Sequence, residues 1–303
     1  MSAAVIYSHY GSPEVLVLSE VVPPEPGPGQ VLVRVRAATV NPLDIKLRRG
    51  DMSLVRPQRF PVTPGLDAAG IVAAVGADVQ GLEVGDEVFG ATITGSYADF
   101  ALMEAPTPKP AGLEWGLAAS LATVGEAAYR ALAHLGLEAG QTLLVHGAAG
   151  SVGAIATQLA VARDIIVIGS VGPDDLKEVE SFGATAVEYG PGLVNRVRFA
   201  APQGVDAALD TAGHGVLPDS IELTGSADTV ITIADPAAGQ FGVRFTGDDH
   251  SDRAFAALPE LAELAVEGKL TVRVWGRYPL TDAARAHAEI EAGTAHGKII
   301  LLP

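Results

Sequence analysis

The 303-residue chain carries 36 Asp and Glu residues against 20 Lys and Arg residues, and 48% of its residues are hydrophobic. This composition predicts a globular protein, long enough for two domains. The formal net charge of −16 disfavours nucleic acid and anionic membranes as partners. The absence of Cys excludes disulfides, a thiolate nucleophile and Cys-ligated zinc. Neither a signal-peptide pattern nor an apolar run of membrane-spanning length is present, so we expect a cytoplasmic protein.

The first 115 residues predict a β-rich domain. Frequent Gly and Pro turns, such as the connector at 23–29, separate short β-branched or apolar segments. The expected strands are 15–21, 31–38, 70–76, 85–90 and 95–102. Short strands joined by turns are typical of a compact antiparallel barrel.

From about residue 115 the pattern changes to strand–helix alternation. An Ala- and Leu-rich helix is expected at 117–135. The strands that follow are expected at 143–145, 165–168, 183–189, 205–210 and 229–234, with helices at 152–162 and 174–182. The C-terminal part predicts a helix at 254–267, a strand at 272–275, a helix at 282–292 and a closing apolar strand from Lys298. Continuous apolar strands interleaved with helices predict a parallel sheet covered on both faces, and therefore an α/β fold.

A glycine turn between the expected strand 143–145 and helix 152–162 is the most informative motif. It reads Gly147, Ala148, Ala149, Gly150, Ser151, Val152, Gly153. Gly150 and Gly153 fit the second and third glycines of the G-x-G-x-x-G fingerprint, and Ala148 stands in place of the first. The second glycine allows backbone to approach a pyrophosphate, which the helix N-terminus attracts. We expect all seven residues to bind a dinucleotide, although glycine turns also join strands to helices without a ligand.

The residues after the second strand bear on which cofactor is bound. Sites that prefer NAD place an acid about 20 residues beyond the glycines, where it bonds the ribose hydroxyls. Here that position is occupied by Gly169 and Ser170, which favours NADPH. Ser170 can donate a hydrogen bond to a 2′-phosphate, and Lys177 can add positive charge. Two acids at 174–175 weaken this preference.

Several segments, in the same order along the chain, resemble the zinc-independent quinone oxidoreductases of the medium-chain dehydrogenase/reductase superfamily, the group that includes zeta-crystallin. These segments are PGQVLVRV at 28–35, VNPLD at 40–44, PVTPGLDAAG at 61–70, VGDEVFG at 84–90, GSYAD at 95–99, the glycine turn and HGKIIL at 296–301. The resemblance implies a GroES-like β-barrel catalytic domain formed by residues 1–120 and 247–303, and a Rossmann doubly wound parallel-sheet nucleotide-binding domain at 121–246. It also implies a nicotinamide in the cleft between them and homodimers formed through the nucleotide domains.

The resemblance also bears on zinc. Zinc-dependent members of the superfamily use Cys and His in the segments that match 40–44 and 65–70, where this chain has Asn41 and Asp67. Its seven His residues show no ligand spacing. We therefore expect no metal site and no metal-assisted alcohol oxidation.

The same likeness suggests catalytic residues. In the family the asparagine that matches Asn41 lies beside the nicotinamide ribose and the substrate, while Pro42 and Asp44 are expected to shape the turn and cap the next helix. Many relatives have tyrosine where this chain has Lys46, and a lysine there resembles the reductases of alkenals and alkenones. Its charge would stabilise an enolate or quinol anion; the alternative is a solvated lysine on a helix.

Further family positions concern the cofactor. Thr123 lies where the family contacts the nicotinamide, and Tyr189 matches a tyrosine near the 2′-phosphate. Ala212 and Ile233, in turns after later strands, are expected to bring backbone to the cofactor. Glu126 replaces the usual threonine, and the sequence leaves open whether its carboxylate is mechanistic or turned away.

Together these features predict an NADPH-dependent reductase that transfers hydride, without metal, to a quinone or an α,β-unsaturated ketone or aldehyde. The expected partner is this small-molecule substrate. One alternative is an enoyl-thioester reductase, which would need a basic entrance for a phosphorylated carrier. The other is a non-catalytic NADPH-binding sensor or structural protein.

Overall fold

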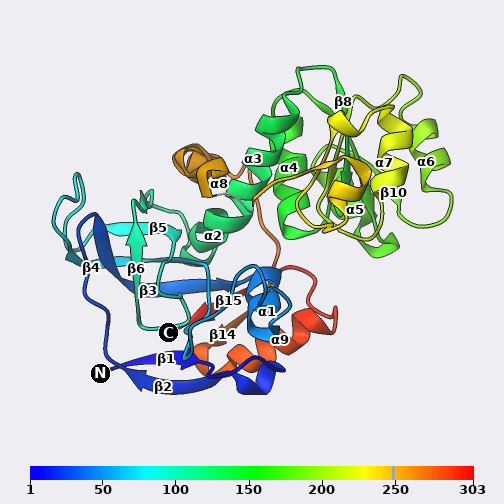
Figure 1. The fold of residues 1–303 in the computed structure, drawn as a ribbon. Helices are drawn as coiled ribbons and strands as arrows, with labels where there is room; N and C mark the ends of the chain where they lie inside the picture. The colour runs from blue at the N-terminus through cyan, green and yellow to red at the C-terminus, as the bar shows by residue number, and fades with distance from the viewer. Residues whose placement is uncertain (248–249) are drawn as a thin grey trace. The chain divides into compact units, whose positions relative to one another are not determined.

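The computed structural model describes residues 1–247 and 250–303 as two compact units of an α/β protein (Figure 1). We call Met1–Thr123, Leu258–Gly268 and Val272–Pro303 the β unit, and Val124–Ala257 with Lys269–Thr271 the α/β unit. The β unit thus draws on both ends of the chain.

A seven-stranded sheet forms the centre of the β unit. Its main path runs β14 (Val274–Pro279), β15 (Lys298–Leu302), β3 (Gln30–Val40), β4 (Asp67–Val75), β5 (Glu87–Ala91) and β7 (Thr107–Pro108), while β6 (Phe100–Glu104) also pairs with β3. A separate two-stranded sheet joins β1 (Ser2–Ile6) to β2 (Val17–Val21). Val31, Val33 and Val35 alternate along β3 and are buried in the core of this unit, as the period of two along a strand requires.

Four helices complete the β unit: α1 (Pro42–Arg49), α2 (Trp115–Ser120), α8 (Leu258–Val266) and α9 (Ala283–Glu291). The start of α1 follows the expected capping pattern, because the Asp44 carboxylate accepts a 2.8 Å hydrogen bond from the backbone N–H of Asn41. The helix ends at Gly50, which adopts the left-handed conformation with φ of 87°.

The α/β unit contains a six-stranded sheet in which every neighbouring pair is parallel. Its order is β10 (Thr185–Glu188), β9 (Ile166–Val171), β8 (Thr142–His146), β11 (Ala207–Asp210), β12 (Val230–Thr232) and β13 (Arg244–Phe245). The helices are α3 (Glu126–Leu135), α4 (Ser151–Val161), α5 (Leu176–Ser181), α6 (Leu193–Ala200) and α7 (Leu217–Thr224). This is the doubly wound order 3-2-1-4-5-6, so the predicted parallel sheet is confirmed.

Two expected elements differ from the structure. The helix predicted at 117–135 is interrupted by a π-helical turn at Leu121–Gly125, a feature that Ala and Leu spacing does not reveal. The strand predicted at 95–102 begins only at Phe100, because Ser96 and Tyr97 both donate backbone hydrogen bonds to the carbonyl of Pro64 and so form a turn. Helices α6 and α7 lie in segments for which the sequence pattern predicted no helix, because Gly and Pro precede or begin these short helices.

Candidate functional site

The glycine turn lies at the carboxyl end of β8, where ligands of open parallel sheets bind. Gly147 has φ of 73°, and the backbone N–H groups of Gly147 and Ala148 donate to the carbonyl of Ser170 at 3.0 and 3.3 Å. A Cβ added to Gly153 would lie 2.2 Å from the carbonyl oxygen of Gly147. The turn and the first turn of α4 are therefore in backbone contact, which only glycine permits at position 153.

Ala148, which occupies the place of the first fingerprint glycine, is accommodated by a glycine on the neighbouring strand. Its side chain is fully buried, and a Cβ on Gly169 would lie only 2.7 Å from the Ala148 methyl carbon. Gly150 caps the start of α4 in an extended conformation, and a helix leaves the N–H groups of its first turn without helical partners. A glycine turn between a parallel strand and a helix N-terminus is the arrangement at which dinucleotide-binding folds hold a pyrophosphate.

Ser170 lies on β9 beside this turn, and its hydroxyl group faces the interior. Only 2% of the residue is exposed, and its Oγ lies 3.0 Å from Nδ1 of His146. On the other side of the ring, Nε2 lies 3.0 Å from Oγ of Ser220. Ser220 donates its own hydroxyl proton to the carbonyl of Val216, so it accepts from Nε2–H of His146. Nδ1 of His146 then accepts a hydrogen bond from the hydroxyl group of Ser170, so this hydroxyl proton is donated within the protein.

His146 is neutral in this environment. Burial lowers the pKa of His146 to about 4, and the carboxylate of Asp210 only partly opposes the effect. A neutral ring held between two hydroxyl groups is a structural element next to the turn.

Ala212 and Ile233 follow the ends of β11 and β12, as expected. Asp210 Oδ1 accepts 2.9 Å hydrogen bonds from the backbone N–H groups of Ala212 and Gly213, and the Ile233 N–H donates to the Asp210 carbonyl. Asp210 Oδ2 accepts from the hydroxyl of Thr232. Asp210 therefore fixes the two turns as a strand-end cap, with both carboxylate oxygens occupied.

Tyr189 and Lys177 lie near the end of β9 and are open to solvent. Tyr189 is 63% exposed, its N–H donates to the Val171 carbonyl, and a Cβ on Gly172 would lie 3.5 Å from its ring. Lys177 is exposed on α5. The sequence predicts 2′-phosphate contacts for both residues, and their exposure leaves both side chains accessible.

Glu126 is fully buried at the start of α3 and is enclosed by cations. Its carboxylate accepts from Nε of Arg130 and from Nη1 of Arg253, each at 2.8 Å, and from the backbone N–H of Ala254 at 2.9 Å. Of the two roles left open by the sequence, these contacts support the structural one. Thr123 lies in the π-helical turn before it and is partly exposed.

In the β unit, Asn41 belongs to a buried polar cluster. Its Oδ1 accepts a 2.5 Å hydrogen bond from Nζ of Lys298, and its Nδ2 donates to Oδ2 of Asp67 at 3.1 Å. Asp67 Oδ1 accepts from both the hydroxyl and the backbone N–H of Thr39. The side chain of Asn41 is thus fixed in one orientation. Burial lowers the pKa of Lys298, while Asp67 and Asp44 oppose that shift.

Asp44 adjoins this cluster. Its Oδ2 accepts from the Asn41 N–H and from the hydroxyl of Tyr97 at 3.4 Å, and the Tyr97 oxygen also lies 3.1 Å from Nε2 of His287. Burial and the neighbouring Asp67 carboxylate raise the pKa of Asp44 to about 7. Burial also lowers the pKa of His287 to about 3.

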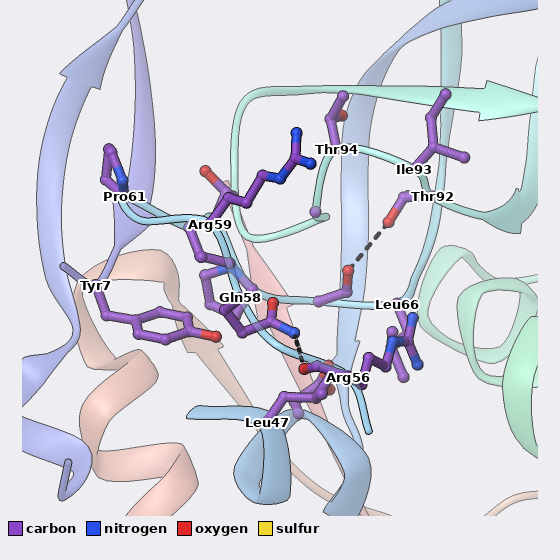
Figure 2. Close-up of a pocket in the computed structure, with 16 residues that line it drawn as sticks. Tyr7, Leu47, Arg56, Gln58, Arg59, Pro61, Leu66, Thr92, Ile93 and Thr94 are labelled. Atoms are coloured by element: carbon purple, nitrogen blue, oxygen red, sulfur yellow. Dashed lines mark hydrogen bonds between the residues drawn. The ribbon is translucent and has the colours of Figure 1, made fainter. Parts of the chain in front are cut away.

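A cavity of about 300 Å³ opens beside α1 (Figure 2). Asp44 and Leu47 of α1 form part of its wall, and the loop that follows α1 contributes Arg56, Gln58 and Arg59. Lys46, on the same helix, is exposed, so the structure does not bring it together with the buried Asn41 cluster. The sequence pattern indicated neither the arginines of this loop nor Lys298, whose contact with Asn41 spans 257 residues.

Within residues 1–247 and 250–303, no three His, Asp or Glu side chains gather in a group that could hold a metal ion. Among the helices of the same ranges, none combines the length and hydrophobicity that a membrane span needs.

Comparison with known proteins identifies the family. Residues 27–133 match the family model described as an alcohol dehydrogenase GroES-like domain, and residues 183–301 match that of a zinc-binding dehydrogenase. A quinone oxidoreductase from Lama guanicoe is 32% identical over 99% of this chain and 97% of its own length. The chain belongs to the zeta-crystallin-like quinone oxidoreductases of the medium-chain dehydrogenase/reductase superfamily. It is an oxidoreductase that acts on a small molecule, and the resemblance stated from the sequence is confirmed.

Other relatives extend this result. An NADPH-dependent alkenal/one oxidoreductase of Arabidopsis thaliana is 30% identical over 98% of this chain and 78% of its own length. The structure of a mycobacterial quinone oxidoreductase aligns over the full length of both chains with a TM-score of 0.87 and 29% identity. A mycobacterial protein complexed with NADPH aligns equally fully, with a TM-score of 0.85 and 29% identity. The expected pairing of a GroES-like domain with a Rossmann-like domain is confirmed.

Proposed function

We propose that this chain is an NADPH-dependent reductase of quinones or of α,β-unsaturated ketones and aldehydes. The observation that supports the proposal is the glycine turn at 147–153, which lies between a parallel strand and a helix N-terminus, in a chain whose relatives include quinone and alkenal/one oxidoreductases. We assign residues 121–246, which contain the turn, to the nucleotide-binding domain. We assign residues 1–120 and 247–303 to the catalytic domain.

When bound, the cofactor supplies a hydride from C4 of its nicotinamide. The acceptor gains that hydride at an electrophilic ring atom or at the β-carbon and becomes a quinol anion or an enolate, which then takes one proton from water. Lys46, which is exposed on α1 and apart from the Asn41 cluster, is our candidate for the cation that stabilises the new oxyanion. Asn41 positions the reactants through its remaining amide N–H, because Lys298 and Asp67 hold that amide in one orientation.

The preference for NADPH rests on position and charge. No acid stands at Gly169 or Ser170, and Tyr189 and Lys177 are both exposed nearby. The hydroxyl group of Ser170 donates to His146, and its carbonyl accepts from the backbone of the glycine turn, so we assign Ser170 a supporting role in the turn. We assign the 2′-phosphate contacts to Tyr189 and Lys177. Thr123, Ala212 and Ile233 complete the proposed cofactor contacts.

We further propose a homodimer formed through the α/β unit. Strand β13 ends the sheet order, so one of its edges is unpaired within the sheet. Phe245 lies on this strand and is 37% exposed, and Phe241 lies just before it and is 40% exposed. An unpaired edge with exposed aromatic side chains is suited to a second copy of the same sheet.

The test is acceptor-dependent cofactor oxidation by purified, chelator-treated protein. NADPH and NADH are each supplied with 1,4-naphthoquinone and with a simple enone. Faster loss of NADPH with either acceptor supports the proposal and names the acceptor class. Tight cofactor binding without oxidation by either acceptor contradicts it and favours a sensor or structural protein.

A further inference from the structure

The cavity beside α1 contains two arginines that the proposed chemistry does not use. Arg56 and Arg59 both line it, and both residues are exposed. Figure 2 shows the Arg59 side chain extended toward Thr94, and the Arg56 guanidinium on the side of Leu66. Neither guanidinium has an ion pair or hydrogen bond to another described residue.

Two unpaired arginines are notable in so acidic a chain. Asp and Glu number 36 against 20 Lys and Arg, so carboxylates are abundant for pairing. Arg49, at the end of the same helix α1, illustrates this, because its guanidinium pairs with Asp51 at 3.3 Å. Arg56 and Arg59 therefore stand out as donors that remain available to a ligand.

The one carboxyl group in the cavity wall does not neutralise them. Asp44 is 2% exposed, and its Oδ2 accepts from the Asn41 N–H and the Tyr97 hydroxyl. Burial and Asp67 raise its pKa to about 7, so its negative charge is only partial near neutral pH. The cavity wall therefore carries more positive than negative charge.

The rest of the wall is suited to a mainly apolar molecule. Its apolar side chains are Leu47, Pro61, Val62, Pro64, Leu66 and Ile93. A cavity of about 300 Å³ lies at the lower end of the range for small-molecule sites and accepts a one- or two-ring body. Such a site selects an apolar ring with an anionic substituent, since guanidinium forks bind carboxylate and phosphate through paired hydrogen bonds.

We infer that this cavity binds the acceptor, and that the preferred acceptor carries an anionic group, carboxylate or phosphate, held by Arg56 and Arg59. This inference rests on the proposed reductase function and adds the substrate class. Asp44 and Leu47 of α1 line the cavity and Lys46 of the same helix does not, so we place the anionic group at the two arginines and the reacting carbonyl at another part of the acceptor.

The test compares a charged acceptor with its neutral ester and with an acceptor that carries phosphates. The probes are a 1,4-naphthoquinone with a carboxymethyl substituent, its neutral methyl ester, and an enoyl-coenzyme A that presents phosphates. We expect kcat/KM for the acid to exceed that for the ester by ~10- to 100-fold, the range of charge-assisted hydrogen bonds. Calorimetric binding of acid and ester without cofactor repeats the comparison independently of turnover.

The variant Arg56→Gln/Arg59→Gln should reduce the ratio of kcat/KM for the acid to kcat/KM for the ester to about one. Arg49→Gln is the matched control, because it removes one charge from α1 outside the cavity wall and should keep the ratio. A preference for enoyl-coenzyme A that the double variant abolishes also supports the inference and assigns the anion to phosphate.

Two results would overturn the inference. One is equal kcat/KM for acid and ester in the unaltered protein, with enoyl-coenzyme A no better than either. The other is an anion preference that survives in the double variant. In both cases turnover of the neutral ester would leave the proposed reductase function standing, whereas failure of every acceptor would remove the function itself.

Discussion

The ammonium group of Lys298 lies 2.5 Å from Oδ1 of Asn41, and both residues are buried. The contact joins the last strand of the chain to the start of α1. Asn41 in turn donates to Asp67, so a cation, an amide and a carboxylate form one buried chain of hydrogen bonds. The buried ammonium of Lys298 and the buried carboxylate of Asp67 balance each other only while both are present.

Lys298→Met should therefore destabilise the protein by about 3 kcal/mol, because it leaves the Asp67 carboxylate buried without a nearby ammonium. Urea unfolding measures the change. Lys177→Met removes an exposed lysine and should alter the unfolding free energy by less than about 0.5 kcal/mol. Equal stability of the Lys298→Met and Lys177→Met variants would contradict the account of the cluster.

Asp44 should make stability depend on pH. Because its folded pKa is raised to about 7, its contribution is fully present below the unfolded value near 3.8 and is lost as pH rises through 7. The stability of the unaltered protein relative to Asp44→Asn should fall between pH 5 and pH 8. The opposite contribution of His146, whose folded pKa is lowered, is common to both proteins and cancels. A difference that does not change with pH would show that Asp44 is not perturbed.

Ser170→Ala separates support of the turn from phosphate recognition. The change leaves Nδ1 of His146 without its donor and should cost about 1–2 kcal/mol of stability. The ratio of Kd for NADH to Kd for NADPH should stay the same, as measured by titration of each cofactor. A selective loss of NADPH affinity would return the Ser170 hydroxyl to the 2′-phosphate site.

Gly153→Ala should abolish tight cofactor binding, because the new Cβ would lie 2.2 Å from the carbonyl of Gly147 and displace the turn. Gly239→Ala is a suitable control, since no atom lies within 4 Å of the added Cβ. Cofactor titration, with circular dichroism to verify folding, compares the two. Unchanged NADPH affinity in Gly153→Ala would exclude this turn as the phosphate site.

Glu126→Gln should lower stability by about 2–3 kcal/mol, because Arg130 and Arg253 lose their charged acceptor. The pH dependence of reduction should keep its shape, as expected of a structural carboxylate. A lost ionisation in the pH–rate profile would instead give Glu126 a part in proton transfer.

The local motifs could be predicted from the sequence because their signals are short. The glycine turn comprises seven residues at the junction of a strand and a helix. The atom that excludes a Cβ at Gly153 is the carbonyl oxygen of Gly147, only six residues away. The capping of α1 by Asp44 is equally local, since its carboxylate accepts from the backbone N–H of Asn41, three residues earlier. Backbone geometry over such spans constrains residue type directly.

The polar contacts could not be predicted because they depend on tertiary packing. Lys298 stands in an apolar strand pattern, and nothing local indicates that its ammonium faces Asn41, 257 residues away. Arg253 lies 127 residues from Glu126. The direction of the hydrogen bond between Ser170 and His146 depends on Ser220 as well. These three side chains come from separate elements, which only the fold brings together.

The most direct test of the central claim is anaerobic single turnover. Chelator-treated protein is first mixed with stoichiometric NADPH and then, in a stopped-flow instrument, with 1,4-naphthoquinone or an enone. The account predicts an exponential loss of reduced-nicotinamide absorbance that is stoichiometric with protein and faster at higher acceptor concentration. Reduced cofactor that stays bound and unoxidised with both acceptors would contradict it.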